Sequence, residues 1–316
     1  MNSKRLFTEH PYKIILSLIS CVLWGSAFPV LKISYEELKI GQNDMNSRLA
    51  LAGMRFFLAS LLIFIFIVLV MKTSIKVGKK DLLNLLLLGS IQTALYYFLF
   101  YNGIANTTGM KGSIIGALET FIMIILAHFL YNNDKIDSTK IIGLIAGFAG
   151  VIFANWGKSF GLEISFKGEG LLIISSFIGA ATSIYIKNYS QRLHPFLITA
   201  WQMFLGSLVM LALSLPKITK GSMVFNTKSS LLLIYSALLS AVAFSIWYTL
   251  LKYNKAGEIS IYRFFIPVSG ALLSALFLPE ENFTLPIFIA LVLVALGVVF
   301  VNKRSNKKGK EVADFK

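Results

Sequence analysis

Long apolar runs recur along the whole chain, and they constrain its fold more than any other feature. Each is about 17–24 residues long, the length that an α-helix needs to cross roughly 30 Å of hydrocarbon. The ten runs cover residues 12–33, 48–71, 82–104, 110–131, 138–156, 168–187, 195–214, 229–251, 258–278 and 286–302. Only 14% of the residues are charged, whereas soluble domains carry about 25%. The sequence therefore predicts an all-α, multi-pass membrane protein with ten transmembrane helices.

Lysine and arginine are distributed unequally between the two sides of such a bundle. With the N-terminus inside and the first run retained as a helix, the inner segments hold 19 of the 30 basic residues and the outer ones hold nine. Positive charge accumulates in cytoplasmic loops. We therefore expect a cell (inner or plasma) membrane protein with both termini in the cytoplasm and a basic cytoplasmic tail, 303–316. This placement of the net charge of +15 favours contact with membrane lipid over nucleic acid.

The chain contains an internal repeat. A shift of 147 residues aligns 51–155 with 198–302 without a gap. Each half then has five spans, 12–156 and 168–302, and an odd number forces the second half to enter the membrane upside down. Inverted repeats of this kind are typical of transporters with a midplane site between the halves, reached alternately from either side. A purely structural pair of bundles is the alternative.

Several stretches resemble a known family in their order and spacing. They are "LWGSAFPVLKIS" (23–34), "MRFFLASLLI" (54–63), "FYNGIANTTGMKGSIIGALETF" (100–121) and "IPVSGALLSALFLPEENFTLPIFIALVLVALGVVFV" (266–301). In these the chain resembles the drug/metabolite transporter superfamily, and within it the EamA family of ten-helix exporters. The resemblance implies metabolite transport, often export of amino acids, without ATP. The chain departs from the family at Thr120, where a proline is common, while the repeat partner Pro267 keeps it.

Three charged residues lie well inside the predicted spans: Arg55, Glu119 and Arg263. A charge at that depth costs about 2.5–3.5 kcal/mol, so it usually faces a cavity or a partner. At roughly 1.5 Å per residue, Glu119 falls near the midplane, with Arg55 about 7 Å to its outer side and Arg263 about 7 Å to its inner side. Glu119 and one arginine could hold the ends of a zwitterion, Glu119 could couple to protons, or the residues could form a permanent structural ion pair. His128 lies on the opposite side of the helix from Glu119, and we expect it at the inner interface.

Aromatic residues and prolines complete the candidate site. Four deep aromatic residues are predicted to line the solute cavity: Trp24, Tyr96, Tyr97 and Trp201. Three others are expected in the aromatic belts of the membrane interface: Tyr101, Trp247 and Tyr248. Gln202, the repeat counterpart of Arg55, is predicted as a polar neighbour of the cavity. Pro29 and Pro267 are predicted helix breaks, although simple kinks would serve equally.

The leading hypothesis for function is a secondary active exporter of small metabolites such as amino acids. An uptake permease or a drug-efflux carrier of the same fold is the alternative. An intramembrane enzyme is disfavoured because H-E-x-x-H, G-x-S-x-G and clustered metal ligands are absent from the sequence. The missing soluble domain disfavours a structural or sensory module. No cofactor or metal is expected; the solute, proton coupling and the choice between monomer and homodimer stay open.

Overall fold

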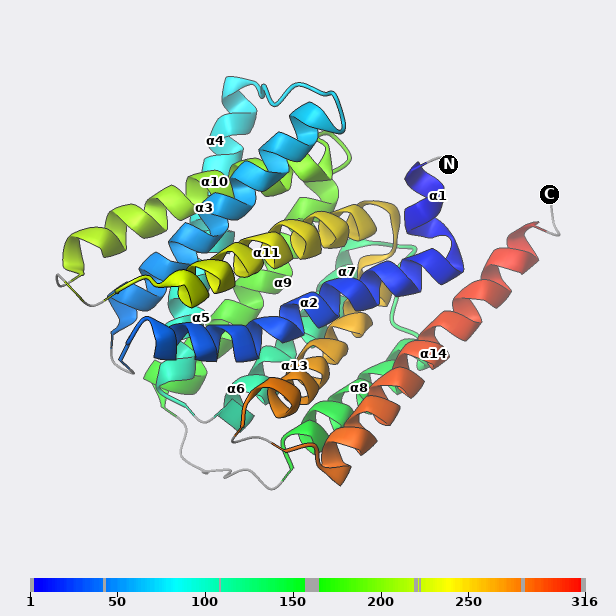
Figure 1. Cartoon of the computed structure of the whole chain (residues 1–316). Helices are drawn as coiled ribbons and strands as arrows, with labels where there is room; N and C mark the ends of the chain where they lie inside the picture. The colour runs from blue at the N-terminus through cyan, green and yellow to red at the C-terminus, as the bar shows by residue number, and fades with distance from the viewer. Residues whose placement is uncertain are drawn as a thin grey trace.

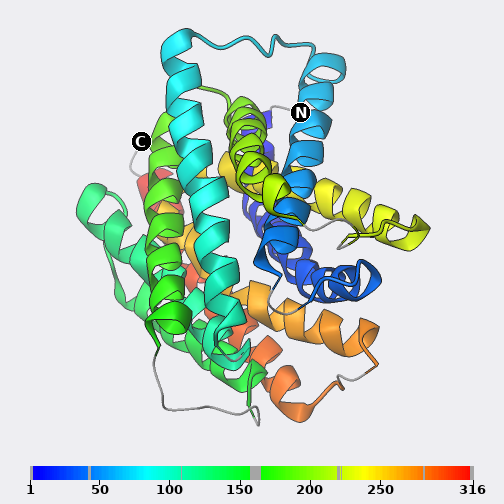
Figure 2. The ribbon, with the colours of Figure 1, turned by 90° about the vertical axis from the view of Figure 1, so that its left-hand side faces the viewer.

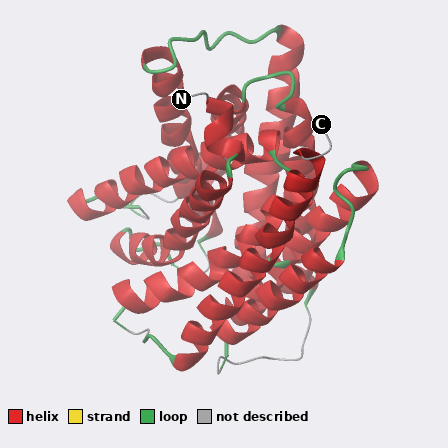
Figure 3. Cartoon of the chain, turned by 90° about the vertical axis from the view of Figure 1, so that its right-hand side faces the viewer, coloured by secondary structure: helices red, strands yellow, loops and turns green. Residues whose placement is uncertain are grey.

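The computed structural model describes residues 3–41, 44–107, 109–156, 165–218, 221, 223–279 and 282–313, without the side chains of 3, 109–111 and 301–313. Within these residues, every regular element is helical (Figure 3). The first half comprises α1 (Ser3–Thr8), α2 (His10–Glu37), α3 (Met45–Leu69), α4 (Lys79–Leu88), the π-helical η1 (Gly89–Leu95), α5 (Tyr96–Ala105), α6 (Gly109–Gly116), α7 (Leu118–Leu130) and α8 (Ser138–Ala154). The fold therefore begins as a run of antiparallel helices joined by short connections.

The second half is also built of helices. It comprises the π-helical η2 (Phe166–Gly170), α9 (Leu171–Tyr189), α10 (Pro195–Ser214), the 3-10 helix η3 (Leu215–Lys217), α11 (Thr227–Tyr253), α12 (Ala256–Ser260), the 3-10 helix η4 (Ile261–Phe264), α13 (Phe265–Phe277) and α14 (Leu285–Ala313). Side-chain caps fix several helix starts. Asp44 accepts a hydrogen bond from the Ser47 amide at α3, and Asn226 and Ser229 form a capping box at α11. The last helix extends through much of the segment predicted as a tail (Figure 1).

The number of helices able to cross a membrane is close to the prediction. Eight helices or continuous helical runs in the described residues are long and apolar enough: His10–Glu37, Met45–Leu69, Lys79–Ala105, Gly112–Leu130, Phe166–Tyr189, Pro195–Lys217, Thr227–Tyr253 and Ala256–Phe277. Two shorter apolar helices, Ser138–Ala154 and Leu285–Phe300, correspond to the fifth and tenth predicted spans. The prediction of an all-helical, multi-pass membrane protein is confirmed.

Two of the predicted spans are interrupted near mid-depth. The fourth breaks at Ala117 between α6 and α7, and the ninth passes through η4 before α13 begins at Phe265. These interruptions lie 147 residues apart to within one residue, as the repeat requires. The predicted prolines are not the points of interruption. Helix α2 runs through Pro29, and Pro267 falls in the first turn of α13, where a missing N–H leaves no intrahelical bond unmade.

Helices related by the repeat pack against each other. Helix α3 lies on α10, and α8 lies beside α14 (Figure 1). At the second of these contacts, a Cβ added to Gly150 would lie 3.0 Å from the Ala290 carbonyl oxygen. A Cβ added to Gly297 would lie 3.1 Å from the Gly143 carbonyl oxygen. The two contacts are reciprocal under the 147-residue shift, and both need glycine for close backbone approach.

We expect Gly150→Ala to destabilise the protein by about 1–3 kcal/mol, because overpacking would force α8 away from α14. Unfolding of the purified protein in mixed micelles, followed by circular dichroism, measures this. Gly116→Ala is the matched control, since a Cβ there meets no described atom within 4 Å. It should be neutral or stabilising by up to about 1 kcal/mol. Equal effects of the two substitutions would contradict the packing argument.

Candidate functional site

A cavity of about 430 Å³ lies between the two halves of the chain. Its volume is within the range of sites for small molecules, about 300–1,000 Å³. Helices α2, α3, α5, α6 and α7 and the segment η1 line it from the first half, and α11, η4 and α13 line it from the second. Seven of the predicted site residues line it: Trp24, Arg55, Tyr96, Tyr97, Glu119, Arg263 and Pro267. The cavity thus gathers the intramembrane charges in one place.

A buried ion pair connects the halves at this cavity. Arg263 Nη2 lies 2.7 Å from Glu119 Oε2, and Glu119 is only 4% exposed. The Tyr96 hydroxyl donates a second hydrogen bond, of 3.3 Å, to the same oxygen. Glu119 lies in the first turn of α7, directly after the break at Ala117. The free N–H groups of that turn give the helix start a partial positive charge, which favours a carboxylate there.

Both members of this pair are held in place by neighbouring side chains or backbone. The Arg263 guanidinium carbon lies 5.6 Å from the centre of the Trp24 ring and 5.7 Å from that of Trp247, distances typical of cation–π contacts. The Glu119 carboxylate rests against Gly179 of α9, where an added Cβ would lie 2.6 Å from Oε1. Sequence reasoning missed the contributions of Trp247 and Gly179.

Arg55 has a different environment from Arg263. It is 4% exposed, lines the cavity, and donates from Nε to Ser240 Oγ at 2.6 Å. In the part of the chain that the structure describes, no carboxylate lies within ion-pair distance of it. The sequence placed both arginines within reach of Glu119, and the structure pairs Glu119 with Arg263.

The repeat counterpart of this bond is present in the other half. Gln202, which corresponds to Arg55, accepts a 2.9 Å hydrogen bond from Thr93 Oγ1. Thr93 in turn corresponds to Ser240 under the same 147-residue shift. The two side-chain bonds are therefore a reciprocal pair. Gln202 is buried in this contact and is not among the residues that line the cavity.

Other predicted residues lie elsewhere than expected. Trp201 is outside the cavity lining: its indole Nε1 donates to the Ile75 carbonyl at 2.9 Å, in the connection between α3 and α4 that crosses the top of Figure 2. The expectation that Tyr101, Trp247 and Tyr248 belong to an interfacial belt was wrong. They are 6%, 1% and 1% exposed, because they face the centre of the bundle rather than its perimeter. Tyr101 lines the cavity.

The cavity extends toward one end of the bundle only. Its lining reaches Lys32, Ile104 and Leu278, at the ends of their helices that are predicted to face outward. Residues of the predicted cytoplasmic end, such as Lys13 and Glu258, are not among those that line it. The two ends of the pathway therefore differ in this structure.

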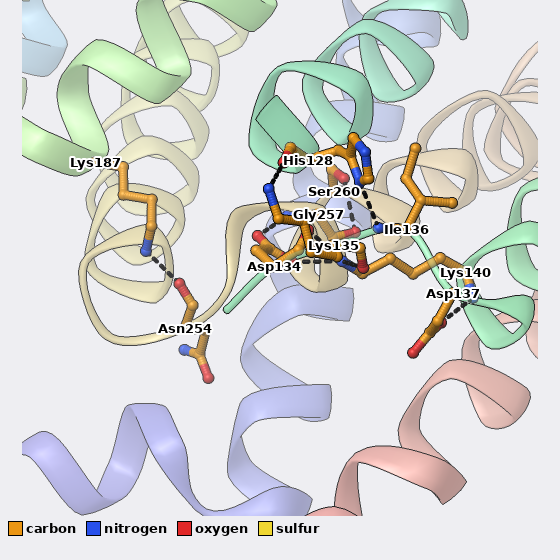
Figure 4. A network of polar contacts seen from close by, with 10 residues as sticks. All are labelled: His128, Asp134, Lys135, Ile136, Asp137, Lys140, Lys187, Asn254, Gly257 and Ser260. Atoms are coloured by element: carbon orange, nitrogen blue, oxygen red, sulfur yellow. Dashed lines mark hydrogen bonds and ion pairs between the residues drawn. The ribbon is translucent and has the colours of Figure 1, made fainter. Parts of the chain in front are cut away.

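A polar network closes the other end, and we call it the closed-end network: Lys13, Asp134, Lys140, Gly257 and Glu258. Lys13 Nζ pairs with Glu258 Oε1 at 2.5 Å, and both side chains are buried. Asp134 pairs with Lys140 at 2.5 Å and accepts a 2.8 Å hydrogen bond from the Gly257 amide (Figure 4). These contacts tie α2 and the α7–α8 connection to the start of α12.

His128 stabilises the connection that carries Asp134. Its Nδ1 accepts a 3.0 Å hydrogen bond from the Ile136 amide, and its carbonyl accepts from Lys135 Nζ at 2.8 Å (Figure 4). On the neighbouring helix, Lys187 Nζ donates to the carbonyl oxygens of Leu251 and Asn254 at the end of α11. Each group is used to hold backbone in position at this end of the bundle.

A bundle of membrane-spanning helices around a cavity that holds charged side chains is an arrangement that membrane transporters use. Family comparison agrees: the family described as "EamA-like transporter family" matches residues 11–156 and again 166–303. The chain therefore belongs to the EamA-like transporter family. Membership implies a small-molecule solute and contact with membrane lipid.

Several curated proteins are similar over most of their length. The "Uncharacterized transporter YetK" of Bacillus subtilis (strain 168) is 27% identical, with 90% of this chain and 84% of that protein covered. The "Probable amino-acid metabolite efflux pump" of Escherichia coli (strain K12) is 26% identical, with 90% and 92% covered. A solved structure, "Crystal structure of protein", superposes with a TM-score of 0.76 at 12% identity and covers 95% of this chain and 99% of its own. That likeness concerns the fold alone.

We expect Glu119→Gln or Arg263→Gln to lower the free energy of unfolding by about 3–5 kcal/mol, because each leaves a buried charge without its partner. The double substitution should recover part of the loss. Unfolding in mixed micelles measures all three variants. Arg192→Gln is the control, since Arg192 pairs with Asp81 through a side chain that is 60% exposed, and such pairs contribute under about 1 kcal/mol. Losses that simply add would show that the two residues are not coupled.

Proposed function

We propose that the protein is a secondary active transporter that exports small metabolites such as amino acids, with its site in the cavity between the two halves. The observation that carries the proposal is the Glu119–Arg263 ion pair in that cavity, one residue coming from each half. Any movement of the halves must carry or rearrange this pair. The relative named as a probable amino-acid metabolite efflux pump supports the solute class and the direction.

The proposal includes a ten-helix arrangement in two inverted repeats of five helices, 12–156 and 168–302. The reciprocal Arg55–Ser240 and Gln202–Thr93 contacts support it, since they interchange under the 147-residue shift. The helix interruptions and the two successive family matches support it as well. On the charge distribution, both termini and the basic tail 303–316 are on the cytoplasmic side.

Alternating access would require opposite changes at the two ends of the cavity. In the described state, the cavity extends toward the predicted outer end while the closed-end network holds the predicted cytoplasmic end. Loading a solute from the cytoplasm therefore requires the Lys13–Glu258 pair and the Asp134–Gly257 hydrogen bond to separate. Uptake and drug efflux would use the same two states. The direction of transport and the identity of the substrate therefore distinguish these alternatives from metabolite export.

Counterflow in proteoliposomes tests the function. Vesicles loaded with individual amino acids should exchange labelled solute through the wild-type protein, and Glu119→Gln should reduce the rate at least about tenfold, since a buried charge pair is broken. Repeating the assay with an imposed pH gradient tests proton coupling. Wild-type rates for Glu119→Gln would contradict the role of that residue. Failure of wild type to move any solute under any gradient would contradict the transporter proposal itself.

The role of the closed-end network can be tested through the accessibility of Cys21, the single cysteine of the chain. Cys21 is fully buried on α2, where its thiol donates to the Tyr262 carbonyl at 3.2 Å. Lys13→Glu would place two carboxylates together and open this end of the bundle. We expect labelling of Cys21 by a membrane-permeant maleimide to accelerate several-fold, because α2 and η4 separate. The swapped variant Lys13→Glu/Glu258→Lys should restore protection, and equal labelling of all three forms would contradict the account.

A further inference from the structure

Arg55 is a buried cation that the Glu119–Arg263 pair does not neutralise. Its side chain lines the cavity and is 4% exposed, and its hydrogen bond to Ser240 is made by Nε. Among the described residues, the two terminal guanidinium nitrogens have no hydrogen-bond partner and no carboxylate within ion-pair distance. A guanidinium presents these nitrogens as a planar fork that fits a carboxylate.

A second unsatisfied donor belongs to another residue of the cavity lining. Tyr101 is 6% exposed and lines the cavity, and its hydroxyl is buried without a hydrogen-bond partner in the described chain. Its ring packs at a tilt against that of Tyr97, with centroids 5.7 Å apart, and the Tyr97 ring packs in the same way against Phe56, at 4.7 Å. Arg55 and Tyr101 therefore line the same cavity, and each carries hydrogen-bond donors that have no partner in the described chain.

The repeat counterpart of Arg55 indicates what the fold alone requires at this position. In the second half, neutral Gln202 makes the corresponding bond to Thr93 and is buried just as fully. A neutral side chain thus satisfies the packing and hydrogen bonding of this position. The charge of Arg55 is additional to that structural requirement, and it is retained only in the copy that lines the cavity.

We propose that Arg55 and the Tyr101 hydroxyl form a subsite for the carboxylate of the transported solute. The solute class is then a small carboxylic acid, an amino acid or a simple organic acid, whose apolar or aromatic body contacts the ring-lined wall: Trp24, Phe28, Tyr97, Phe100 and Phe244. A cationic amine without a carboxylate is repelled by the same guanidinium. This inference rests on the proposed transport function and specifies its substrate.

Binding of three probes with one phenyl body tests the subsite: 3-phenylpropanoate, L-phenylalanine and 2-phenylethylamine. We expect the wild-type protein in nanodiscs to bind the two carboxylates at least about tenfold more tightly than the amine in calorimetric titrations. Arg55→Gln, which copies the neutral residue of the other half, should weaken both carboxylates at least about tenfold and should bind the amine at least as tightly as wild type, because the repelling charge is gone. Arg55→Lys should keep part of the affinity, and Arg192→Gln should keep all of it.

Tyr101→Phe is the second variant, since it removes only the hydroxyl. It should weaken the carboxylates by about three- to tenfold. The subsite is overturned if wild type prefers the amine or binds neither carboxylate. It is also overturned if Arg55→Gln binds both as tightly as wild type, or loses all three probes equally.

Counterflow through the wild-type protein tests the proposed transport function separately from the subsite. Carboxylate binding that depends on Arg55, without any counterflow, would overturn the transport proposal and leave the subsite standing. Amino-acid counterflow that Arg55→Gln does not alter would overturn the subsite and leave the transport proposal standing.

Discussion

The high cost of an unpaired charge in hydrocarbon is the constraint on which this structure depends. A carboxylate near the bilayer midplane must have a partner, and Glu119 finds it in Arg263 of the other half. The two indoles around Arg263 and the glycine beside Glu119 fix that pair in one geometry. Because one residue comes from each half, the pair also links the halves where they meet, and it places charged groups in the cavity between them.

Several contacts recur under the 147-residue shift, whereas the charges do not. The hydrogen bonds of Arg55 and Gln202 join corresponding positions, with donor and acceptor exchanged, and the glycine contacts between α8 and α14 recur at nearly the same distance. The charges break this equivalence: Glu119 corresponds to Ile266, and Arg263 to Gly116. In the transport mechanism that we propose, the duplicated frame would allow two related conformations, and the unequal charges would give the cavity between the halves a polarity along its length.

The fold was largely accessible from the sequence because apolar length and charge are local properties. Residues such as Glu119 and Arg263 are recognisable one at a time, and their depth follows from counting along a helix. Which arginine reaches the glutamate depends on side-chain direction, which counting cannot supply. Trp201 was misplaced for a related reason: the acceptor for its indole is the Ile75 carbonyl, in a connection that folds back over the helix. Trp247 lies near a span end in sequence but faces the bundle centre, and depth says nothing about that angle.

The central claim is that solute binds between the two halves, beside the Glu119–Arg263 pair. An experimental structure of the full chain in nanodiscs, determined with a solute that shows counterflow, tests it most directly. We expect density for that solute in the cavity, in contact with residues of both halves. Density on the lipid-facing perimeter, or within one half alone, would contradict the claim.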